Sequence, residues 1–293
     1  MVKIINFGSL NIDYVYQVPH FVRPGETLPS AGFQKYSGGK GGNQSIALGL
    51  AGAKVSHAGK IGQDSLWLVE GLQAAGVDTS LIEVADMPTG HAIIQVTPDG
   101  ENAIVLHGGA NHSLTPADIA RVFRATSPGD ILLTQNEINR MPDILRAGRD
   151  RGMTIVFNPA PFTPDVRDYP LHLVDMFVLN EIEGAELTQK ETPEDVLSEI
   201  CARFPHAATV LTIGAEGVLY RDSQRDLHIL AEKVIAVDTT AAGDTFIGYF
   251  LATFAEGREV AECLRVGCKA AGICVQRRGA ADSIPHREEV YVP

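Results

Sequence analysis

Short apolar runs rich in β-branched residues alternate along this chain with longer segments of helical character. The first of them are the strand-like KIINFG at residues 3–8, the helical GNQSIALGLAGA at 42–53 and the strand-like KVSHAGKIG at 54–62. Later strand-like runs are DILLTQ, TIVFN, DMFVLN and ATVLTI. This alternation is typical of βαβ units, which build a mostly parallel sheet with helices on both faces. We therefore expect a doubly wound α/β fold.

Two early regions lack a helix between their strands. Residues 12–36 are polar and extended, and AIIQVTPDGENAIVLH at 92–107 has the pattern of a hairpin. Such strands predict a small inserted sheet, from about residues 12–38 and 88–108, that lies as a lid over the sheet edge where ligands bind. Because no linker or internal repeat interrupts the chain, we expect a single domain over residues 1–293.

The charge balance excludes some classes of partner. The chain has 36 acidic and 24 basic residues, a formal net charge of −12, and no block of like charges. Nucleic acid and anionic membranes are therefore excluded as expected partners, whereas a small substrate is compatible. The sequence begins directly with strand-like residues and contains no apolar run near the ~18 residues of a membrane span. We expect a cytoplasmic protein.

The stretch TAAGDTF at residues 240–246 joins an extended run to an apolar helical segment. If the helix begins at Gly243, the amides of Ala241, Ala242, Gly243 and Asp244 converge at its N-terminus and form an anion site. The helix dipole would favour the ionised form of Asp244. This carboxylate could then accept the proton of a hydroxyl that attacks phosphorus, although a helix N-terminal Asp can also be purely stabilising.

Polar residues also follow other predicted strands. Asn11 and Asp13 alternate with Ile12, so both should point to one face and could bind vicinal hydroxyls, unless they form an ordinary Asx turn. The glycine-rich SGGKGGNQS at residues 37–45 matches neither a P-loop nor a dinucleotide fingerprint, and it is either a flexible turn or a close approach to a ligand.

Two further motifs open predicted helices or turns. Asn180 and Glu183 in NEIE form either a capping box or a site at which Glu183 holds hydrated magnesium near a nucleotide phosphate. TIGAEG at residues 212–217 has small residues that would let a nucleotide approach the backbone.

The motifs together resemble one family. GSLNID, GGKGGNQ, NPAP, NEIE, TIGAEG, DTTAAGDTF and QRRGAADSIP occur in the order found in the ribokinase-like, or PfkB, family of sugar kinases. The resemblance spans the whole chain, and AAGD together with GGKGxNQ is its most specific part. It implies ATP-dependent phosphorylation of a sugar hydroxyl, with Asp244 as base and the amides of residues 241–244 as anion hole.

The resemblance also implies the members of each binding site. The implied sugar site comprises Asn11, Asp13, Gly39, Lys40, Asn43, Glu137 and Asp244. The implied nucleotide site comprises Asn180, Thr212, Ile213, Gly214, Ala215, Glu216, Gly217, Gly243 and Cys268. Glu183 is the implied Mg²⁺ residue, acting through water. A monovalent cation, usually K⁺, is implied as an activator, and its site comprises Asp238, Thr240, Cys274, Arg277, Gly279 and Ser283.

The substrate expectation also rests on the resemblance. Family members that act on phosphorylated sugars carry an arginine after the glycine-rich motif, whereas the corresponding run here is NQSIA. We therefore expect a free pentose, first D-ribose, with D-ribose 5-phosphate as product. The alternatives are a kinase of deoxyribose, a ketohexose or a nucleoside on the same fold, and a non-catalytic sugar-binding regulator. The family further implies a homodimer formed through the lid. Gly42, where alanine is usual, and Cys268 depart from its pattern.

Overall fold

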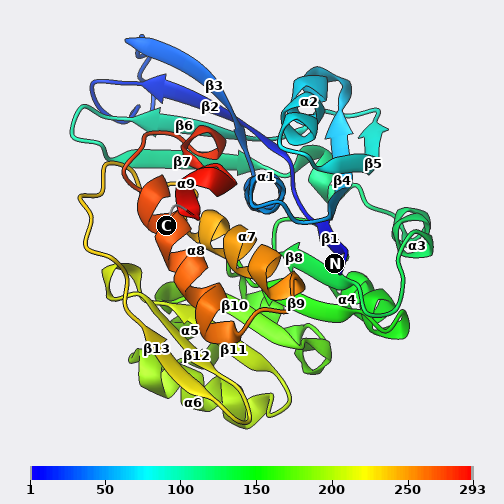
Figure 1. Cartoon of the computed structure of the whole chain (residues 1–293). Coiled ribbons are helices and arrows are strands. Elements are labelled where there is room, and N and C mark those ends of the chain that lie inside the picture. The colour runs from blue at the N-terminus through cyan, green and yellow to red at the C-terminus, as the bar shows by residue number, and fades with distance from the viewer. Residues whose placement is uncertain (1, 292–293) are drawn as a thin grey trace.

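The computed structural model describes residues 2–291 and contains one large and one small sheet (Figure 1). The large sheet has nine strands in the order β13-β12-β11-β10-β9-β8-β1-β4-β5. Its strands are β1 (Ile4–Phe7), β4 (Val55–Gly62), β5 (Asp78–Ala85), β8 (Ile131–Gln135), β9 (Thr154–Asn158), β10 (Met176–Asn180), β11 (Ala208–Thr212), β12 (Val218–Arg221) and β13 (Asp226–Ile229). All neighbouring strands are parallel except β11–β12 and β12–β13, so the expected doubly wound α/β fold is confirmed.

Helices cover both faces of this sheet. They are α1 (Lys40–Leu50), α2 (Leu66–Ala74), α3 (Pro116–Arg124), α4 (Met141–Asp150), α5 (Glu181–Thr188), α6 (Pro193–Arg203), α7 (Ala242–Ala255), α8 (Val260–Cys274) and α9 (Arg287–Val290). Short 3-10 helices are η1 (Gln63–Ser65), η2 (Gly109–His112), η3 (Pro164–Asp168), η4 (Leu171–Leu173), η5 (Gly214–Glu216) and η6 (Ala281–Ser283). Within residues 2–291, no helix combines the length and apolar character needed to cross a membrane.

The alternation of side chains along the strands divides the core in two. Ile4 packs in the cluster that contains α1, α2, α7 and α8, whereas its neighbour Ile5 packs in the cluster that contains α3, α4, α5 and α6. A parallel strand covered on both faces must be apolar on both sides, which explains the continuous apolar runs in the sequence. The carboxyl ends of the parallel strands consequently meet at one edge of the sheet, between the two helical layers.

The small sheet stands apart from the large one (Figure 1). It has four strands in the order β3-β2-β6-β7, namely β2 (Asn11–Gln17), β3 (Gly32–Gly38), β6 (Gly90–Val96) and β7 (Asn102–His107). The antiparallel β6–β7 pair is the hairpin indicated by the sequence. Because β2 follows β1 and β3 precedes α1, the small sheet is joined to the large one where polar residues follow the strand ends.

Candidate active site

Helix α7 begins at Ala242, one residue before the expected Gly243. Its N-cap residue, Ala241, has a φ of 59° and is left-handed. This conformation is uncommon for a residue with a Cβ and is typical of backbone that the surrounding structure constrains. The turn before α7 is therefore held in a left-handed conformation by its surroundings.

The backbone amides at this helix start are not all free. The first intrahelical bond joins the Thr245 N–H to the cap carbonyl at 2.8 Å, so the amides of Gly243 and Asp244 have no intrahelical acceptor. The Ala242 amide instead donates to the carbonyl of Thr239 at 3.3 Å. The helix start therefore presents fewer free amides than the sequence interpretation assumed.

Asp244 is buried beside this turn, with an exposed fraction of 7%. Its Oδ1 accepts from Nε2 of Gln44 at 2.9 Å, and its Oδ2 accepts from Nδ2 of Asn43 at 3.1 Å. Burial raises the pKa of Asp244, and Lys40, Gln44 and Asn43 oppose this rise. Burial outweighs these groups, so the net shift of the pKa is opposite to the effect expected from the helix dipole alone.

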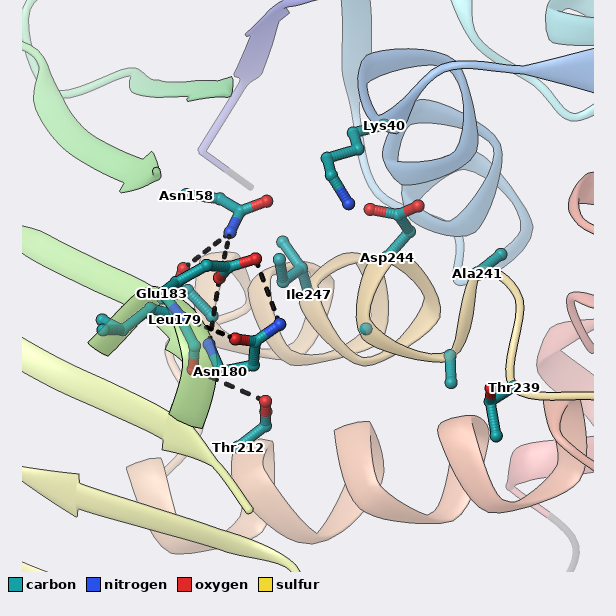
Figure 2. Close-up of a pocket in the computed structure, with 13 residues that line it drawn as sticks. Lys40, Asn158, Leu179, Asn180, Glu183, Thr212, Thr239, Ala241, Asp244 and Ile247 are labelled. Carbon is teal, nitrogen blue, oxygen red and sulfur yellow. Dashed lines mark hydrogen bonds between the residues drawn. The ribbon is translucent and has the colours of Figure 1, made fainter. Parts of the chain in front are cut away.

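Lys40 lies at the beginning of α1 and points toward Asp244 (Figure 2). Burial acts to lower the pKa of Lys40, but the carboxylates of Asp244, Glu137 and Glu183 raise it above its ordinary value. Lys40 therefore remains a cation, close to a carboxylate that burial makes basic.

A small cavity and a larger cleft meet at these residues. The small cavity, of about 230 Å³, includes Asn158, Asn180, Glu183, Thr212 and Gly243 in its lining (Figure 2). The larger cleft, of about 1340 Å³, lies against the small sheet. Both are lined by Lys40, Ala241 and Asp244. A group transferred from one ligand to another would pass these three residues.

The larger cleft contains every residue of the expected sugar site. Its lining includes Asn11, Asp13, Gly39, Lys40, Asn43, Glu137 and Asp244. These residues come from β2, the β3–α1 junction, α1, the loop after β8, and α7. The structure therefore brings together residues that are far apart in the sequence.

The carboxylates of this cleft are partly desolvated. Burial raises the pKa of Asp13 to about 6, and the nearby charge of Glu137 adds to the rise. Burial also raises the pKa of Glu137, although Lys40 opposes the rise. Glu137 accepts from the backbone N–H of Lys40 at 2.9 Å and from the hydroxyl of Ser9. Acceptors for hydroxyl groups are thus held in place by the chain itself.

Glycine makes the approach of α1 to β1 possible. Gly39 has a φ of 87°, which glycine adopts without strain. A Cβ on Gly41 would lie 2.4 Å from the backbone nitrogen of Ser9. No side-chain rotation could relieve this clash, because the nitrogen belongs to the backbone. The glycine-rich motif therefore permits close packing of backbones, which places Lys40 and Asn43 at the cleft.

Glu183 lines the small cavity and also forms the capping box (Figure 2). Its Oε2 accepts from the Asn180 N–H at 3.0 Å and its own N–H donates to the Asn180 Oδ1 at 2.9 Å. Burial raises the pKa of Glu183. Within residues 2–291 no group of three or more His, Cys, Asp or Glu side chains could cage a metal ion. One carboxylate beside the cavity suits Mg²⁺ that retains several waters.

The expected nucleotide residues are only partly assembled. Asn180, Thr212 and Gly243 line the small cavity. The segment Ile213–Gly217 does not line it, and Ile213 is buried in the core. Cys268 on α8 packs against the core cluster that contains α1, α2 and α7. Burial raises the pKa of its thiol to about 11.

The expected monovalent-cation residues lie together between the loop before α7 and the end of α8. Asp238 accepts from the amide of Thr240 at 2.9 Å and from that of Gly279 at 3.0 Å. The Cys274 Sγ lies 3.7 Å from the Thr240 carbonyl oxygen and 3.1 Å from the Ser283 Oγ. Arg277 is different, because its side chain pairs with Glu289 and only its backbone faces this cluster, through a bond from its N–H to the Cys274 carbonyl. Carbonyl, hydroxyl and carboxylate oxygens suit a hard cation.

The sequence interpretation missed several buried amides that lie around the site. Asn111 on η2 binds Asn11, and Gln44 binds Asp244. Asn158 and Gln135 bind Gln44 in turn. GGKGGNQ contains Gln44 and NPAP contains Asn158, whereas Asn111 and Gln135 lie outside the quoted motifs. No periodicity or spacing distinguishes an amide that binds another side chain from one that faces solvent.

Comparisons with known proteins agree with this geometry. The profile of the family described as "pfkB family carbohydrate kinase" matches residues 1–287. A ribokinase of Staphylococcus aureus (strain COL) is 36% identical over 301 residues, which cover 98% of this chain and 98% of that protein.

Solved structures give the same result. The crystal structure of ribokinase from Cryptococcus neoformans var. grubii serotype A in complex with ADP superposes with a TM-score of 0.86, at 33% identity and over 99% of both chains. The structure of Arabidopsis thaliana ribokinase complexed with ribose and ATP has a TM-score of 0.87, at 28% identity, and covers 99% of this chain and 97% of that one.

Proposed function

The chain belongs to the pfkB family of carbohydrate kinases, and from this premise we propose that it transfers the γ-phosphoryl group of ATP to a hydroxyl of free D-ribose, giving D-ribose 5-phosphate and ADP. One observation carries the proposal. Asp244 and Lys40 line both the cavity that would take the nucleotide and the cleft that would take the sugar. The full-length similarity to ribokinases supports ribose as the sugar and ATP as the donor.

Asp244 acts as the general base. The substrate hydroxyl donates to its carboxylate, and its proton moves to Asp244 as the oxygen forms a bond to the γ-phosphorus. The bond between that phosphorus and the β–γ bridging oxygen breaks, and ADP leaves. Burial raises the pKa of Asp244, which makes its carboxylate a better proton acceptor near neutral pH.

Backbone amides and the ammonium group of Lys40 would stabilise the negative charge on the transferred phosphoryl group. The amides of Gly243 and Asp244 lack intrahelical acceptors, and the positive end of the α7 dipole lies there. Lys40 remains cationic beside them. Glu183 would hold hydrated Mg²⁺, which neutralises charge on the phosphate oxygens when it is bound. Asn180 and Thr212 would contact the nucleotide inside the small cavity. The other expected nucleotide residues, Ile213–Gly217 and Cys268, do not line this cavity and would contact only parts of the nucleotide that extend beyond it.

The side chains that line the larger cleft would bind the hydroxyl groups of the sugar. Asp13 and Glu137 offer acceptors, and Asn11 offers its amide. Asn43 donates to Asp244 and has a buried Oδ1 that no group within residues 2–291 satisfies. A sugar hydroxyl is a suitable donor to this atom. The small sheet would act as a lid on the bound sugar.

The proposal includes a monovalent cation and a dimer. K⁺ would be held between the 238–240 loop and residues 274–283, mainly by backbone carbonyls, and would steady the loop that leads into α7. A homodimer would form through the small sheet, which exposes large apolar side chains on β3, β6 and β7. These are Phe33, Ile93, Ile104, Val105 and Leu106. Light scattering during size-exclusion chromatography would give the mass, and Val105→Asp should yield monomers. The expected cytoplasmic location stays a prediction from the sequence.

The decisive experiment measures ADP formation from ATP with Mg²⁺ and K⁺. D-ribose is compared with deoxyribose, fructose, tagatose and adenosine, and each is assayed with the wild type, with Asp244→Asn and with Asp150→Asn, a control at the exposed end of α4. We expect D-ribose to give the highest kcat/KM. Asp244→Asn should lower kcat by about 100- to 10,000-fold while calorimetry still detects sugar binding.

Other outcomes assign the function differently. Turnover with another sugar alone would retain the mechanism and reject ribose. Normal turnover by Asp244→Asn would reject Asp244 as base. No turnover with any of the substrates, together with sugar binding, would support a regulator.

A further inference from the structure

We propose that Gln44 is a positioning residue, which holds the carboxylate of Asp244 in its reactive orientation through a side-chain amide whose own direction is fixed by backbone groups. Gln44 has no exposed surface and makes no contact with the cavities. The inference rests on the proposed role of Asp244 as base.

One chain of hydrogen bonds fixes the amide of Gln44 from the side of β10. The Val178 carbonyl can only accept, so the group of Asn158 that lies 2.9 Å from it is the Nδ2 donor. The Oδ1 of Asn158 is therefore the atom that faces Gln44, at 3.1 Å, and it requires a donor. Gln44 must present Nε2 to Asn158. The same Nε2 lies 2.9 Å from the Asp244 Oδ1.

A second chain fixes the same amide from the side of β1. The Gly41 carbonyl can only accept, and it takes a bond from Nδ2 of Asn6 at 2.8 Å. The Oδ1 of Asn6 then accepts from Nε2 of Gln135 at 2.9 Å. That Nε2 also donates to the Gln44 Oε1 at 2.6 Å. Both chains therefore require Gln44 to turn its Nε2 toward Asp244.

The consequence for Asp244 is geometric and electrostatic. A donor fixed against Oδ1, together with Asn43 against Oδ2, leaves the carboxylate little freedom to rotate about χ2. The donor also favours the ionised form, against burial, which raises the pKa of this carboxyl group. Three charged groups from other elements act on Asp244, namely Lys40 at the start of α1, Glu137 after β8 and Glu183 on α5. Gln44, like Asn43, is an uncharged donor to this carboxylate.

The test compares Gln44→Met with Gln135→Met. Both glutamines have no exposed surface. Each substitution removes one amide from the same network and leaves a side chain of similar volume. Of the two glutamines, only Gln44 contacts Asp244. After Gln135→Met, the amide of Gln44 would still be held by Asn158. The measurements are kcat, sugar and ATP KM, the pH dependence of kcat, and the melting temperature.

We expect both variants to be less stable by similar amounts. Gln44→Met should lower kcat by about 10- to 100-fold, because a hydrogen bond to a charged group is lost, with sugar KM changed less than about threefold. The acidic limb of its kcat–pH profile should move to higher pH, since the ionised form of Asp244 loses a donor. Gln135→Met should lower kcat less than about threefold and leave the acidic limb in place.

Equal effects of the two substitutions on kcat and on the pH profile would overturn the inference, because they would show a role limited to stability. Asp244→Asn separates this failure from failure of the proposed function. If Asp244→Asn is inactive and Gln44→Met behaves like Gln135→Met, only the positioning role is rejected. If Asp244→Asn is active, the base assignment fails and the positioning role fails with it.

Discussion

Asn111 donates its side-chain amide to Oδ1 of Asn11 at 2.7 Å and thereby decides which end of the Asn11 amide faces the cleft. The orientation of Asn111 is fixed by one residue. The Leu10 N–H donates to its Oδ1 at 3.0 Å, and the Leu10 carbonyl accepts from its Nδ2 at 3.1 Å. Asn11 must therefore use its Oδ1 for Asn111, which leaves its Nδ2 donor for a ligand.

Asn111→Asp should weaken sugar binding. The new carboxylate has no donor for the Leu10 carbonyl or for Asn11, so the Asn11 amide should turn over and present an acceptor to the cleft. We expect sugar KM to rise about 10-fold or more, from loss of a hydrogen bond to an uncharged partner together with repulsion, while ATP KM stays nearly constant.

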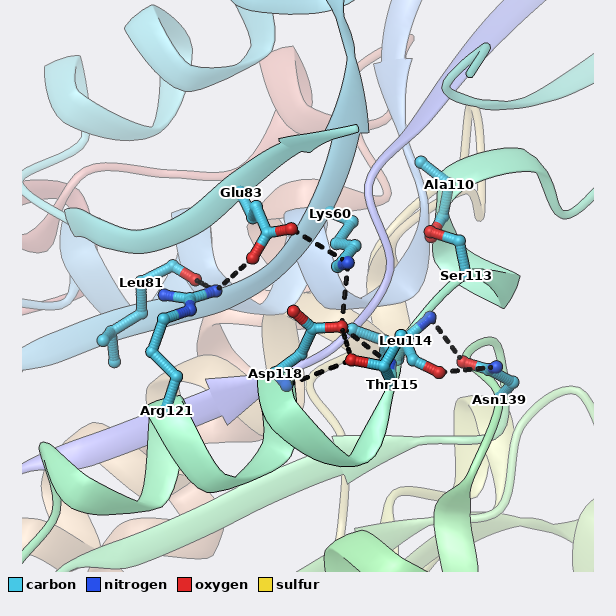
Figure 3. Close-up of polar contacts among 10 residues, drawn as sticks. All are labelled: Lys60, Leu81, Glu83, Ala110, Ser113, Leu114, Thr115, Asp118, Arg121 and Asn139. Atoms are coloured by element: carbon cyan, nitrogen blue, oxygen red, sulfur yellow. Dashed lines mark hydrogen bonds and ion pairs between the residues drawn. The ribbon is translucent and has the colours of Figure 1, made fainter. Parts of the chain in front are cut away.

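Asn139→Asp is the matched control. Asn139 binds both backbone groups of Leu114, at 3.1 and 3.2 Å (Figure 3). Asn111 binds those of Leu10 in the same way, but among the described residues no hydrogen bond joins the Asn139 side chain to Asn11. Its substitution should lower the melting temperature and leave sugar KM within about twofold, because Asn139 bonds to Asn111 only through its backbone N–H, which the substitution retains. Equal changes in KM for the two variants would contradict the assigned role of Asn111.

Asp13→Asn should stabilise the protein and impair sugar binding. Burial raises the pKa of Asp13 to about 6, so its folded-state pKa exceeds the unfolded value. The folded state then binds more protons, and stability falls as pH rises from about 4 to about 6. Removing the charge should raise the free energy of unfolding at pH 7 by up to about 3 kcal/mol.

Urea denaturation at pH 7 and pH 5 tests this prediction for Asp13. The stability advantage of Asp13→Asn over the wild type should be larger at pH 7 than at pH 5, and sugar KM should rise. A variant less stable than the wild type at pH 7 would show that the carboxylate makes stabilising contacts that outweigh its burial.

Gly248→Ala should disturb the site from a distance. A Cβ at Gly248 on α7 would lie 2.3 Å from the Ala47 Cβ on α1, so these two helices would have to separate. They carry Asp244 and Lys40 respectively. We expect a loss of about 1–3 kcal/mol in unfolding free energy, as in other overpacked cores, and a lower kcat.

The control for Gly248 is Gly71→Ala on α2. A Cβ there would have no neighbour within 4 Å, and alanine should stabilise the helix by about 0.5–1 kcal/mol. Thermal unfolding of the two variants should therefore shift in opposite directions.

Lys60→Met should destabilise the protein without a large effect on turnover. The Nζ of Lys60 lies 2.8 Å from Oδ2 of Asp118 and 3.0 Å from Oε1 of Glu83 (Figure 3). The side chains of Lys60 and Asp118 are only 8% and 9% exposed. Removal of the cation therefore leaves a buried carboxylate without an ion-pair partner among the described residues, with hydrogen bonds only from the N–H and hydroxyl of Thr115. Such losses typically amount to about 3–5 kcal/mol. Glu83→Gln should cost less, because Glu83 is 39% exposed and its loss leaves the closer pair intact.

The same ion pair predicts an acid dependence. Although burial acts to raise it, hydrogen bonds from Lys60 and Thr115 hold the pKa of Asp118 below its usual range. The pair's contribution is therefore present above about pH 4, the unfolded value, and is lost as pH falls further. Lys60→Met should abolish this part of the acid dependence, which denaturation between pH 5 and pH 3 would reveal.

The sequence by itself determined the class of fold, and it predicted which residues would gather at one edge of the sheet. Continuous apolar strands such as KIINFG require cover on both faces, and parallel strands place the residues that follow them at one edge. The resemblance to the ribokinase-like family, carried by the motifs after these strands, implied one sugar site for Asn11, Lys40, Glu137 and Asp244, and these four residues line one cleft. The small sheet was indicated by strands without intervening helices.

Tertiary structure alone decided how these residues are held and charged. Burial depends on what packs around a residue from distant parts of the chain, so local sequence could not show that the pKa of Asp244 is raised rather than lowered. It also could not show that Gln44 and Asn111 turn their amides toward Asp244 and Asn11, because hydrogen-bond direction is fixed by partners about 100 to 200 residues away in the chain. The motifs therefore indicate which side chains belong to the proposed site. The packing of distant segments determines how these side chains are oriented and whether they are protonated.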